Sequence, residues 1–585
     1  DKLLGAYAAR RRIYYLNAQV SLIALPPMCV TAALSVFLFS TNREMPGNLW
    51  ILCRTLYCPS TRRSFSINSQ TSTLFVKKFF MSDLPQTDNN SDFSQPPADQ
   101  RLQRLQKMEE LLAEGVQVYG GRVDNTVSTV EASQAFEGQD QEATPELEVR
   151  LAGRLTAMRV MGKSIFADIR DAAGRLQIYV KKNQVGDKAF AMFKKLDLGD
   201  ILTTDGAIFR TRKGEITQKV KSFRLLSKAL RPLPEKWHGL TDIEQRYRQR
   251  YLDLIANEDV KQTFQVRAAF LRELRRLLDT RGFTEVETPM LQPIAGGAAA
   301  RPFETYYTAL DCPMYLRIAP ELYLKKLLVG GMEKVYEINR NFRNEGLSRH
   351  HNPEFTMIEI YEAYSDCTGM MELVEYLISS LAQNVLNTKK LAFGEETEID
   401  LTPPWRRVNY ADLIREQMGK DWYDIDHKDR LERAVAAGLN VVAEMSDSEI
   451  THEVYEKLVE ETLIQPTFVT RLPAELVPLA KTCPDDPSVV DVFELEIGGQ
   501  EIAPGYSELN NPVEQRQRFE EQIERTHGTV EEASSRIDED FLTAMEHGMP
   551  PAGGTGIGID RLLMLFTNSA SIRDVILFPH LRPKQ

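Results

Sequence analysis

The feature that most limits how this chain can fold is a pair of strand-like segments near its middle. Residues 335–343 and 354–364 alternate apolar and polar side chains, and the polar loop between them contains Gly346, Asn352 and Pro353. Alternating segments on either side of turn-forming residues predict an antiparallel hairpin.

Each strand of this hairpin has one polar and one apolar face, because successive strand side chains point to opposite sides. In the second strand Phe355, Glu359 and Tyr361 share a face, and Ile358 and Ile360 take the other. In the first strand the polar side chains also recur at every second position, namely Glu337, Asn339, Asn341 and Arg343. Such a polar face is either exposed to water or the floor of a polar site.

The loop of the hairpin favours a polar site. Its charged and imidazole side chains gather around one turn, namely Arg343, Glu345, Arg349, His350 and His351. Guanidinium and imidazole groups grouped in this way suit an anion such as a triphosphate.

Three separate segments resemble the signature motifs of one enzyme family. FRNEGLSRHHNPEF at 342–355, TPML at 288–291 and GIGIDR at 556–561 resemble the three motifs of class II aminoacyl-tRNA synthetases. The surrounding sequence RPFETYYTALDCPMYLRIAPELYLKKLLVGGMEKVYEINRNFRNEG, residues 301–346, is similar to the bacterial type of lysyl-tRNA synthetase. Three motifs in the right order are far more specific than one short pattern.

The resemblance covers roughly residues 98–583 and implies an α+β fold. It implies an OB-fold β-barrel that binds the anticodon, followed by a class II catalytic domain with an antiparallel sheet flanked by helices. The expected division is an N-terminal extension and tether at 1–97, a helix and connection at 98–145, the barrel at 146–231, a linker at 232–259 and the catalytic domain at 260–585.

Composition agrees with a soluble enzyme of more than one domain. A chain of 585 residues with 43% hydrophobic content can bury more than one core. Its six Cys residues, none in a CxxC pair, fit a reducing compartment and argue against a disulfide scaffold or zinc ribbon. The net charge of -12 disfavours nucleic acid, but residues 146–232 hold 19 Lys and Arg against 9 Asp and Glu, a local balance of +10.

The first 80 residues differ from the rest, and three interpretations stay open. Residues 13–42 lack charge and follow Arg10, Arg11 and Arg12, as in a signal anchor. An organelle transit peptide is the second interpretation. The third, which we favour, is that Met81 is the natural start, with the enzyme in the cytoplasm and no membrane association.

The basic region 146–231 contains short strand-like segments separated by glycine turns, which predicts a small barrel. A basic barrel with an exposed aromatic ring is a common platform for single-stranded nucleic acid. The resemblance implies that Phe166 stacks on an anticodon base while Arg159, Gln177 and Glu215 contact base edges or backbone. From the residues alone, Phe166 fits the barrel core equally well.

Two helices are expected outside the barrel. In residues 98–115 the apolar residues Leu102, Leu105, Met108 and Leu112 have near-helical spacing, and the family likeness makes Arg101, Arg104 and Lys107 candidates for tRNA contact. Residues 260–281 predict a long helix that ends at Gly282. The strand after it resembles motif 1, which implies a homodimer with Pro289 at the interface.

The implied first reaction is attack of an amino-acid carboxylate on the α-phosphate of ATP. Positioning and charge neutralisation should supply most of its rate. The resemblance implies that Arg343 bridges the carboxylate and the α-phosphate, and that Phe355 stacks on adenine. Glu345 and His351 then hold the base or outer phosphates, and Arg561 takes the γ-phosphate, although a glycine-rich turn such as GIGIDR also serves tight packing.

A metal ion and an amino acid complete the implied site. Glu494 and Glu501 match the family's carboxylates for Mg²⁺, an ion that prefers oxygen ligands. Many family members have Asn where this chain has Pro504, so one polar contact near the substrate carboxylate is expected to be missing.

The amino-acid pocket is expected to be acidic. Glu508, Glu359 and Tyr361 match the residues that recognise the ammonium end of lysine. Glu321 is expected to hold the α-amino group, and Gly297 to offer a backbone carbonyl. An aspartate pocket would need cations instead.

We therefore expect ATP-dependent attachment of lysine to tRNA through an aminoacyl-adenylate. Two alternatives remain: a synthetase for aspartate or asparagine, and a nucleic-acid-binding paralogue without catalysis. The acidic pocket opposes the first, and the four intact residues Arg343, Glu494, Glu501 and Arg561 oppose the second.

Overall fold

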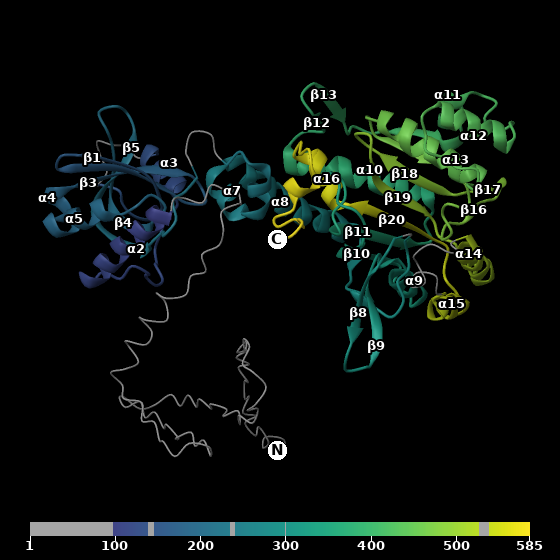
Figure 1. Ribbon diagram of the computed structural model, residues 1–585, viewed down its shortest axis with the longest axis horizontal. Helices are drawn as coiled ribbons and strands as arrows, with labels where there is room; N and C mark the ends of the chain where they lie inside the picture. The colour runs from purple at the N-terminus through teal and green to yellow at the C-terminus, as the bar shows by residue number, and fades with distance from the viewer. Residues whose placement is uncertain (1–97, 139–145, 235–239, 299, 526–536, 585) are drawn as a thin grey trace, which may run out of the picture. The chain divides into compact units, whose positions relative to one another are not determined.

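A computed structural model describes residues 98–138, 146–234, 240–298, 300–525 and 537–584 (Figure 1). These residues form a β-barrel and a larger α+β domain, as expected. The three interpretations of residues 1–80 concern residues outside these ranges. Among the described helices, none has the length and apolar character needed to cross a membrane.

The barrel closes through five strands in the order β1-β2-β3-β5-β4, which confirms the predicted small barrel. The strands are β1 (Glu148–Met161), β2 (Ser164–Arg170), β3 (Arg175–Lys181), β4 (Ile201–Arg210) and β5 (Ile216–Ser227). Two short helices that were not predicted, α4 (Lys182–Val185) and α5 (Asp187–Lys195), connect β3 to β4. Phe190 and Phe193 of α5 are buried in the barrel core.

Helix α2 (Ala98–Ala113) confirms the helix predicted before the barrel, but only part of its predicted apolar side is covered. Leu102 and Leu112 are exposed, and the fully buried residue is Leu111, with Met108 packed beside it. Arg104 donates hydrogen bonds to the carbonyls of Leu198, Ala229 and Arg231, so it anchors the helix to the barrel. Polar anchors of this kind are invisible in the spacing of apolar residues. Lys107 likewise pairs with Asp197 at 2.6 Å, and α3 (Thr129–Glu137) follows.

The second domain is built on an eight-stranded sheet in the order β14-β15-β18-β19-β20-β11-β10-β6. The strands are β14 (Arg406–Asn409), β15 (Thr467–Thr470), β18 (Val492–Glu496), β19 (Glu501–Ser507), β20 (Ala552–Gly558), β11 (Glu354–Ala363), β10 (Lys334–Phe342) and β6 (Thr284–Glu285). Neighbouring strands are antiparallel except for the pairs β10–β6 and β14–β15.

Strands β10 and β11 confirm the predicted hairpin and the composition of its faces. Glu337 lies opposite Glu359, and Asn341 lies opposite Phe355. Facing residues of an antiparallel pair point to the same side, and Glu337, Asn341 and Glu359 are all buried. The polar face is therefore a covered floor and not a solvated surface.

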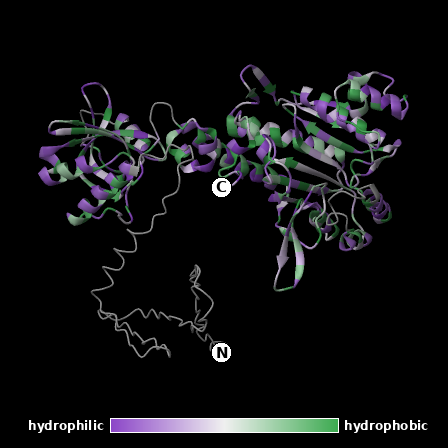
Figure 2. Cartoon of the chain, viewed as in Figure 1, coloured by the Kyte–Doolittle hydropathy of each residue, from purple (hydrophilic) through white to green (hydrophobic). Residues whose placement is uncertain are grey.

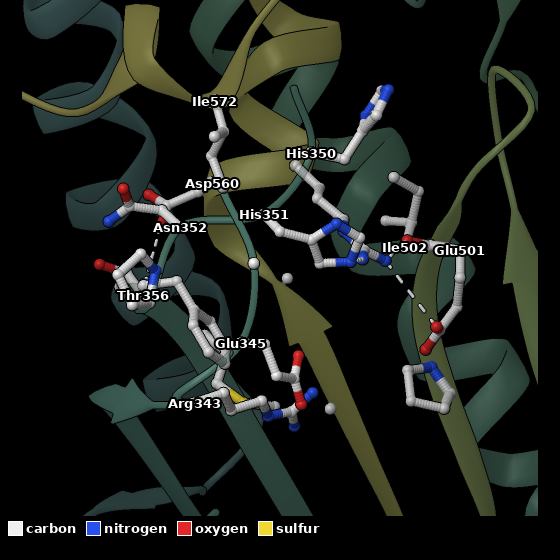
Figure 3. Close-up of a pocket in the computed structure, with 18 residues that line it drawn as sticks. Arg343, Glu345, His350, His351, Asn352, Thr356, Glu501, Ile502, Asp560 and Ile572 are labelled. Atoms are coloured by element: carbon white, nitrogen blue, oxygen red, sulfur yellow. Dashed lines mark hydrogen bonds and ion pairs between the residues drawn. The ribbon is translucent and has the colours of Figure 1, made fainter. Parts of the chain in front are cut away.

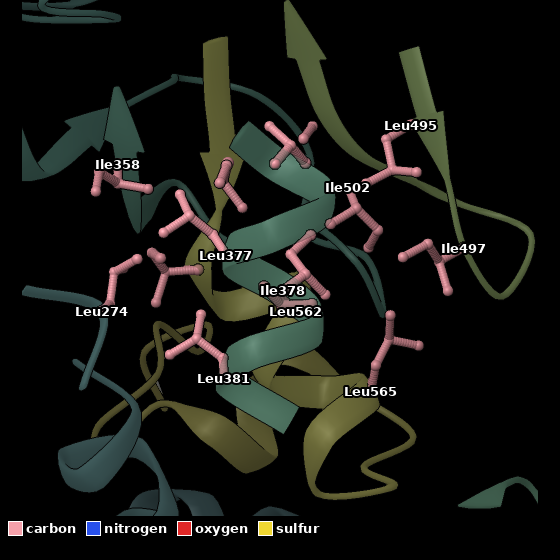
Figure 4. Packing of buried hydrophobic residues seen from close by; sticks show 14 of the residues in the cluster. Leu274, Ile358, Leu377, Ile378, Leu381, Leu495, Ile497, Ile502, Leu562 and Leu565 are labelled. Atoms are coloured by element: carbon pink, nitrogen blue, oxygen red, sulfur yellow. The ribbon is translucent and has the colours of Figure 1, made fainter. Parts of the chain in front are cut away.

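Helices α8 (Glu258–Thr280), α10 (Cys367–Leu381) and α16 (Ile559–Phe566) build the core against the apolar face of this sheet. Figure 4 shows Leu377, Ile378 and Leu381 of α10 among side chains from the strands and from α8 and α16. Hydrophobic residues gather where these helices meet the sheet (Figure 2). Helix α8 confirms the predicted long helix, which stops before Gly282 because that residue has φ +80°.

The remaining elements surround this core. Two linker helices, α6 (Ile243–Arg248) and α7 (Arg250–Ala256), precede α8. A three-stranded sheet consists of β7 (Leu291–Gln292), β8 (Phe303–Tyr307) and β9 (Cys312–Leu316), and helix α9 (Glu321–Val329) follows it. The other helices and strands are η1 (Ala382–Leu386), β12 (Lys390–Phe393), β13 (Thr397–Asp400), α11 (Tyr410–Met418), α12 (His427–Ala436), α13 (Asp447–Val454), η2 (Tyr455–Val459), η3 (Glu460–Thr462), β16 (Thr482–Cys483), β17 (Asp486–Val490), α14 (Pro512–Arg525), α15 (Glu539–Glu546) and α17 (Ile572–Val575).

Candidate active site

A cavity of about 170 Å³ lies at the end of the hairpin, between the β10–β11 loop, β19 and the turn from β20 into α16. Figure 3 shows Arg343, Glu345, His351 and Glu501 around it. All five residues that the sequence predicts for nucleotide binding line this cavity: Arg343, Glu345, His351, Phe355 and Arg561. The structure thus brings together residues that are up to 218 positions apart in the chain.

Arg343 lies at the inner end of the cavity and lacks a partner for part of its guanidinium group. Its guanidinium carbon is 5.1 Å from the centre of the Phe355 ring, and its Nε is buried without a hydrogen-bond acceptor among the described residues. Burial lowers the pKa of Arg343, while the carboxylates of Glu501 and Glu345 act in the opposite direction. A buried cation with unused donors is suited to receive an anionic ligand.

Arg561 and His351 form a pair at the outer side of the cavity. Arg561 Nη1 donates to the carbonyl of Glu501 at 2.8 Å, and Nη2 lies 3.0 Å from His351 Nε2. A guanidinium can only donate, so His351 Nε2 must accept and the ring proton is on Nδ1, which lies 2.8 Å from Ser348 Oγ. Burial and the charge of Arg561 lower the pKa of His351, which agrees with a neutral ring.

Asp560, which the sequence analysis did not single out, ties three elements together beneath the cavity. It accepts hydrogen bonds from Arg267 Nη1 of α8 at 2.5 Å and from the Thr356 amide of β11 at 2.7 Å. Its place beside Arg561 in GIGIDR was the only signal available in the sequence. This carboxylate fixes the start of α16 and with it the position of Arg561.

The polar face of β11 continues from this cavity into a buried cluster of acidic side chains, which we call the acidic pocket. Tyr361 donates from its hydroxyl to Glu359 Oε2 at 2.9 Å, and Glu321 and Glu508 approach from α9 and the end of β19. Glu321, Glu359, Tyr361 and Glu508, the four side chains predicted for the amino acid, are all buried. Strand β11 therefore carries members of both predicted groups, Phe355 for the nucleotide and Glu359 and Tyr361 for the amino acid.

Lys325 and Tyr506 also belong to this pocket, although the sequence analysis did not name them. Lys325 Nζ lies 2.6 Å from Glu321 Oε1 and 2.5 Å from Glu508 Oε2. Tyr506 donates from its hydroxyl to the same Glu321 oxygen at 2.6 Å. The spacing of Glu321 and Lys325 at i and i+4 predicts a helical pair, but nothing in the sequence indicates that Glu508 joins it.

Burial dominates the protonation of the pocket carboxyl groups. It raises the pKa of Glu359 to about 8, with a further contribution from the charge of Glu321. Burial also raises the pKa of Glu508 to about 8, although Lys325 opposes this shift. Glu508 Oε1 has no hydrogen-bond partner within the described part of the chain. A cationic ligand beside these carboxyl groups would therefore favour their ionised form.

Two glycines leave room for these carboxylates. A Cβ atom at Gly554 of β20 would lie 2.0 Å from Glu508 Oε1 and 2.5 Å from Tyr361 Cε1, so only glycine fits there. Gly297 has φ +87°, and a Cβ atom there would lie 3.0 Å from Glu321 Cβ. Gly297 and Glu321, both predicted to contact the amino acid, thus lie side by side.

The barrel presents a second group of predicted residues on the outer face of β1, β2 and β3. Phe166 lies between Arg159 of β1 and Tyr179 of β3 in the strand register, and its ring centre is 4.8 Å from that of Tyr179. Gln177 Nε2 donates to Glu215 at 2.9 Å. Phe166 is half-buried, whereas Ile165 and Ala167 on either side point into the core. The core alternative for Phe166 is therefore wrong.

Comparison with known proteins agrees with this geometry. A family described as "tRNA synthetases class II (D, K and N)" matches residues 242–582, more than half of the chain. The chain belongs to the class II tRNA synthetases. A family described as "OB-fold nucleic acid binding domain" matches residues 149–226 of the barrel.

Several curated relatives of this class II synthetase carry the name "Lysine--tRNA ligase". The protein from Pelotomaculum thermopropionicum is 53% identical over 485 residues, which are 82% of this chain and 94% of the relative. The protein from Halalkalibacterium halodurans is 51% identical over 486 residues, 82% of this chain and 96% of the relative. The Bacillus subtilis protein is 49% identical over 489 residues, 83% and 98% of the two chains.

Pro504, where the sequence analysis expects a polar contact to be missing, lies in the wall of the nucleotide cavity. It follows Glu501, which lines the same cavity, whereas Glu494 lies on β18 outside its wall. A proline side chain offers no polar atom to a substrate. Any contact to a substrate carboxylate at this position must therefore come from another residue, and Arg343 lines the same cavity.

Proposed function

We propose that this class II synthetase attaches L-lysine to its tRNA in two steps. Lysine and ATP first form lysyl-adenylate and pyrophosphate, and the lysyl group then passes to tRNA. The observation that carries the proposal is the single polar face of β11, which joins the cationic cavity at Phe355 to the acidic pocket at Glu359 and Tyr361. This arrangement supports an amino acid with a cationic side chain beside a nucleotide.

The proposed activation step depends mainly on Arg343. Its unused donors would hold the lysine carboxylate against the α-phosphate while Phe355 stacks on adenine. Arg561, oriented by Glu501 and His351, would receive the outer phosphates that leave as pyrophosphate. Glu345 lines the same cavity at its open side and would contact the base.

Lysine itself would be held at both ends. Glu321 would pair with the α-ammonium group, next to the backbone of Gly297. Glu508 and Glu359, with Tyr361, would pair with the side-chain ammonium. A pocket of this kind rejects neutral side chains because its buried carboxylates would lose their partner.

We further propose that Mg²⁺ assists the reaction, held by Glu494 and Glu501. Burial and the charges of Glu501 and Glu460 raise the pKa of Glu494 well above its usual range, and such crowded carboxylates fit an oxygen-preferring cation. Within the described ranges, no three His, Cys, Asp or Glu side chains already form a metal site. The bound ion would neutralise charge on the phosphates.

The anticodon contacts, the dimer and the location are also proposals. The outer face of β1–β3 would bind anticodon bases through Phe166, with Arg159, Gln177 and Glu215 around it.

A homodimer is supported by exposed apolar side chains in the segments that follow Pro289, namely Met290, Leu291, Tyr306 and Tyr307. The mass of the protein in solution tests this proposal. The absence of CxxC pairs in the whole sequence supports the cytoplasm, with an organelle as the alternative if residues 1–80 act as a transit peptide.

The deciding experiment is exchange of labelled pyrophosphate into ATP by the full chain, with lysine, aspartate and asparagine compared. We expect exchange with lysine alone. Exchange with aspartate or asparagine would show that the carboxylates of the pocket do not select the substrate. No exchange with any of the three would support the non-catalytic alternative.

A further inference from the structure

Lys325 has no role in the proposed reaction, although it is the most deeply buried cation in the acidic pocket. Its side chain has 0% exposure and extends from helix α9 to a point between Glu321 and Glu508. A buried ammonium group is costly unless several acceptors surround it. The two carboxylates meet that need, and the ring of Tyr506 lies 5.4 Å from Nζ.

The two carboxylates that Lys325 joins are those proposed for opposite ends of the substrate. Glu321 comes from α9 and Glu508 from the segment after β19, so no local sequence interaction holds them together. Lys325 Nζ donates to Glu321 Oε1 and forms an ion pair with Glu508 Oε2, while both Glu508 oxygens are buried without a hydrogen-bond partner among the described residues. Glu508 Oε1 lies beside Gly554 and Tyr361, where the side-chain ammonium of lysine is proposed to bind.

The charges in the pocket match a substrate with two ammonium groups only when Lys325 is counted. Three carboxylates, those of Glu321, Glu359 and Glu508, face one resident ammonium, so two negative charges remain uncancelled when all are ionised. Lysine brings two ammonium groups, and its carboxylate would be held by Arg343. Without Lys325 a third negative charge would remain in a buried site, where its cost is high.

We propose that Lys325 is a positioning and specificity-determining residue that holds Glu321 and Glu508 in place and matches the charge of the pocket to a diammonium amino acid. This inference rests on the proposed function, because it assumes that lysine binds here. Lys325 acts through the two carboxylates and does not take part in bond making.

Loss of the ammonium should affect lysine and spare ATP. The ionisable groups nearest Lys325 are Glu321 on its own helix, Tyr506 on β19 and Glu508 just after it. Strand β11 adds Glu359 and Tyr361, and strand β10 adds Glu337, whose carboxylate pairs with Arg317. Asp538 and Asp540, before and in α15, pair with the neighbouring Lys326. Removing the Lys325 ammonium group would make the carboxyl groups of the pocket harder to ionise.

The test compares two variants of the full chain with a matched control. Lys325→Gln keeps hydrogen-bond donors without the charge, and Lys325→Met keeps the length of the side chain without either. Lys326→Met removes the adjacent lysine of the same helix, which is partly exposed and pairs with Asp538 and Asp540 outside the acidic pocket. Lysine-dependent pyrophosphate exchange is measured from pH 6.5 to 9, with KM determined for lysine and for ATP.

We expect both Lys325 variants to raise the KM for lysine by roughly tenfold or more, with KM for ATP changed less than about twofold. Their lysine kcat/KM should need a higher pH to reach its plateau than that of the wild type. The Lys326→Met control should behave like the wild type.

An unchanged KM for lysine in Lys325→Gln would overturn the inference, because the charge would then have no role. A lower KM in either variant would also overturn it, since Lys325 would be competing with the substrate. If neither variant folds by circular dichroism, Lys325 is a structural residue and the inference is wrong. Failure of the wild type to exchange with lysine would refute the proposed function instead, so the two failures are distinguishable.

Discussion

The catalytic site and the outer face of the barrel are built from similar side chains, but they differ in how far water is excluded. Both place an aromatic ring beside an arginine on neighbouring strands or turns, Phe355 with Arg343 and Phe166 with Arg159. In the catalytic domain the charged neighbours Glu359 and Glu508 are buried, whereas Arg159 and Glu215 of the barrel are exposed. The first arrangement strengthens each electrostatic contact, and the second leaves contacts screened by water.

This difference in burial indicates that the two regions recognise their ligands in different ways. Buried, unpaired groups discriminate strongly, because a wrong ligand leaves them without a partner. Exposed stacking surfaces contribute smaller and more uniform increments for each base. We therefore expect the catalytic domain to choose the amino acid sharply, and the barrel to add affinity for tRNA in modest steps.

The largest effect should come from Arg343→Ala. Loss of a guanidinium that neutralises charge in the transition state should lower pyrophosphate exchange by about 100-fold to 1,000-fold. The variant should keep its thermal stability, because the side chain has unused donors in the folded protein. Exchange at the wild-type rate would remove Arg343 from the reaction and break the proposed contrast between the two regions.

A smaller effect, confined to the barrel, should follow Phe166→Ala. Losing one stacked base costs ~1–3 kcal/mol, so the KM for tRNA in the charging reaction should rise roughly 5-fold to 150-fold. Pyrophosphate exchange without tRNA should not change, and Phe166→Trp should restore most of the charging activity. Normal charging by Phe166→Ala would mean that the aromatic face of the barrel does not bind the anticodon.

A further effect concerns pH and separates buried from exposed charges. Burial raises the pKa values of Glu359 and Glu508 to about 8, so both carboxyl groups become protonated as the pH falls through that value. An ammonium group needs them ionised, so lysine affinity should be lost as pH falls, by up to about tenfold per pH unit for each proton released. The test measures KM for lysine from pH 6 to 8.5 and compares its pH dependence with that of KM for tRNA. A flat lysine profile would mean that the pocket is already ionised before lysine binds.

Much of the architecture could be predicted from the sequence because it depends on local periodicity. The alternation in residues 335–343 and 354–364 predicts both strands and the composition of both faces, since the side-chain period of a strand is two. The apolar spacing of residues 260–281 predicts α8 within two residues of its start. The five residues predicted for nucleotide binding could be identified from the sequence because they lie in or next to contiguous motifs.

Other features depended on contacts between distant segments. Helix α2 buries Leu111 and not Leu112, because Arg104 and Lys107 fix its rotation through barrel atoms 90 or more residues away. Phe166 could be assigned to the outer face only after the register of β1, β2 and β3 was known. In each case the deciding partner lies outside the window in which periodicity can be observed.

The sequence by itself determined which chemical groups this protein brings to its site: a guanidinium, an aromatic ring and several carboxylates, in motifs that specify a class II synthetase fold. Only the tertiary structure decided how those charges are balanced. Glu321 and Glu508 are 187 residues apart, and Lys325 joins them because helix α9 packs against β10 and β11, in an apolar cluster that also contacts Tyr506 of β19. Charge balance in a buried pocket is a property of all the groups that share its low dielectric surroundings, and proximity of that kind exists only in the folded chain.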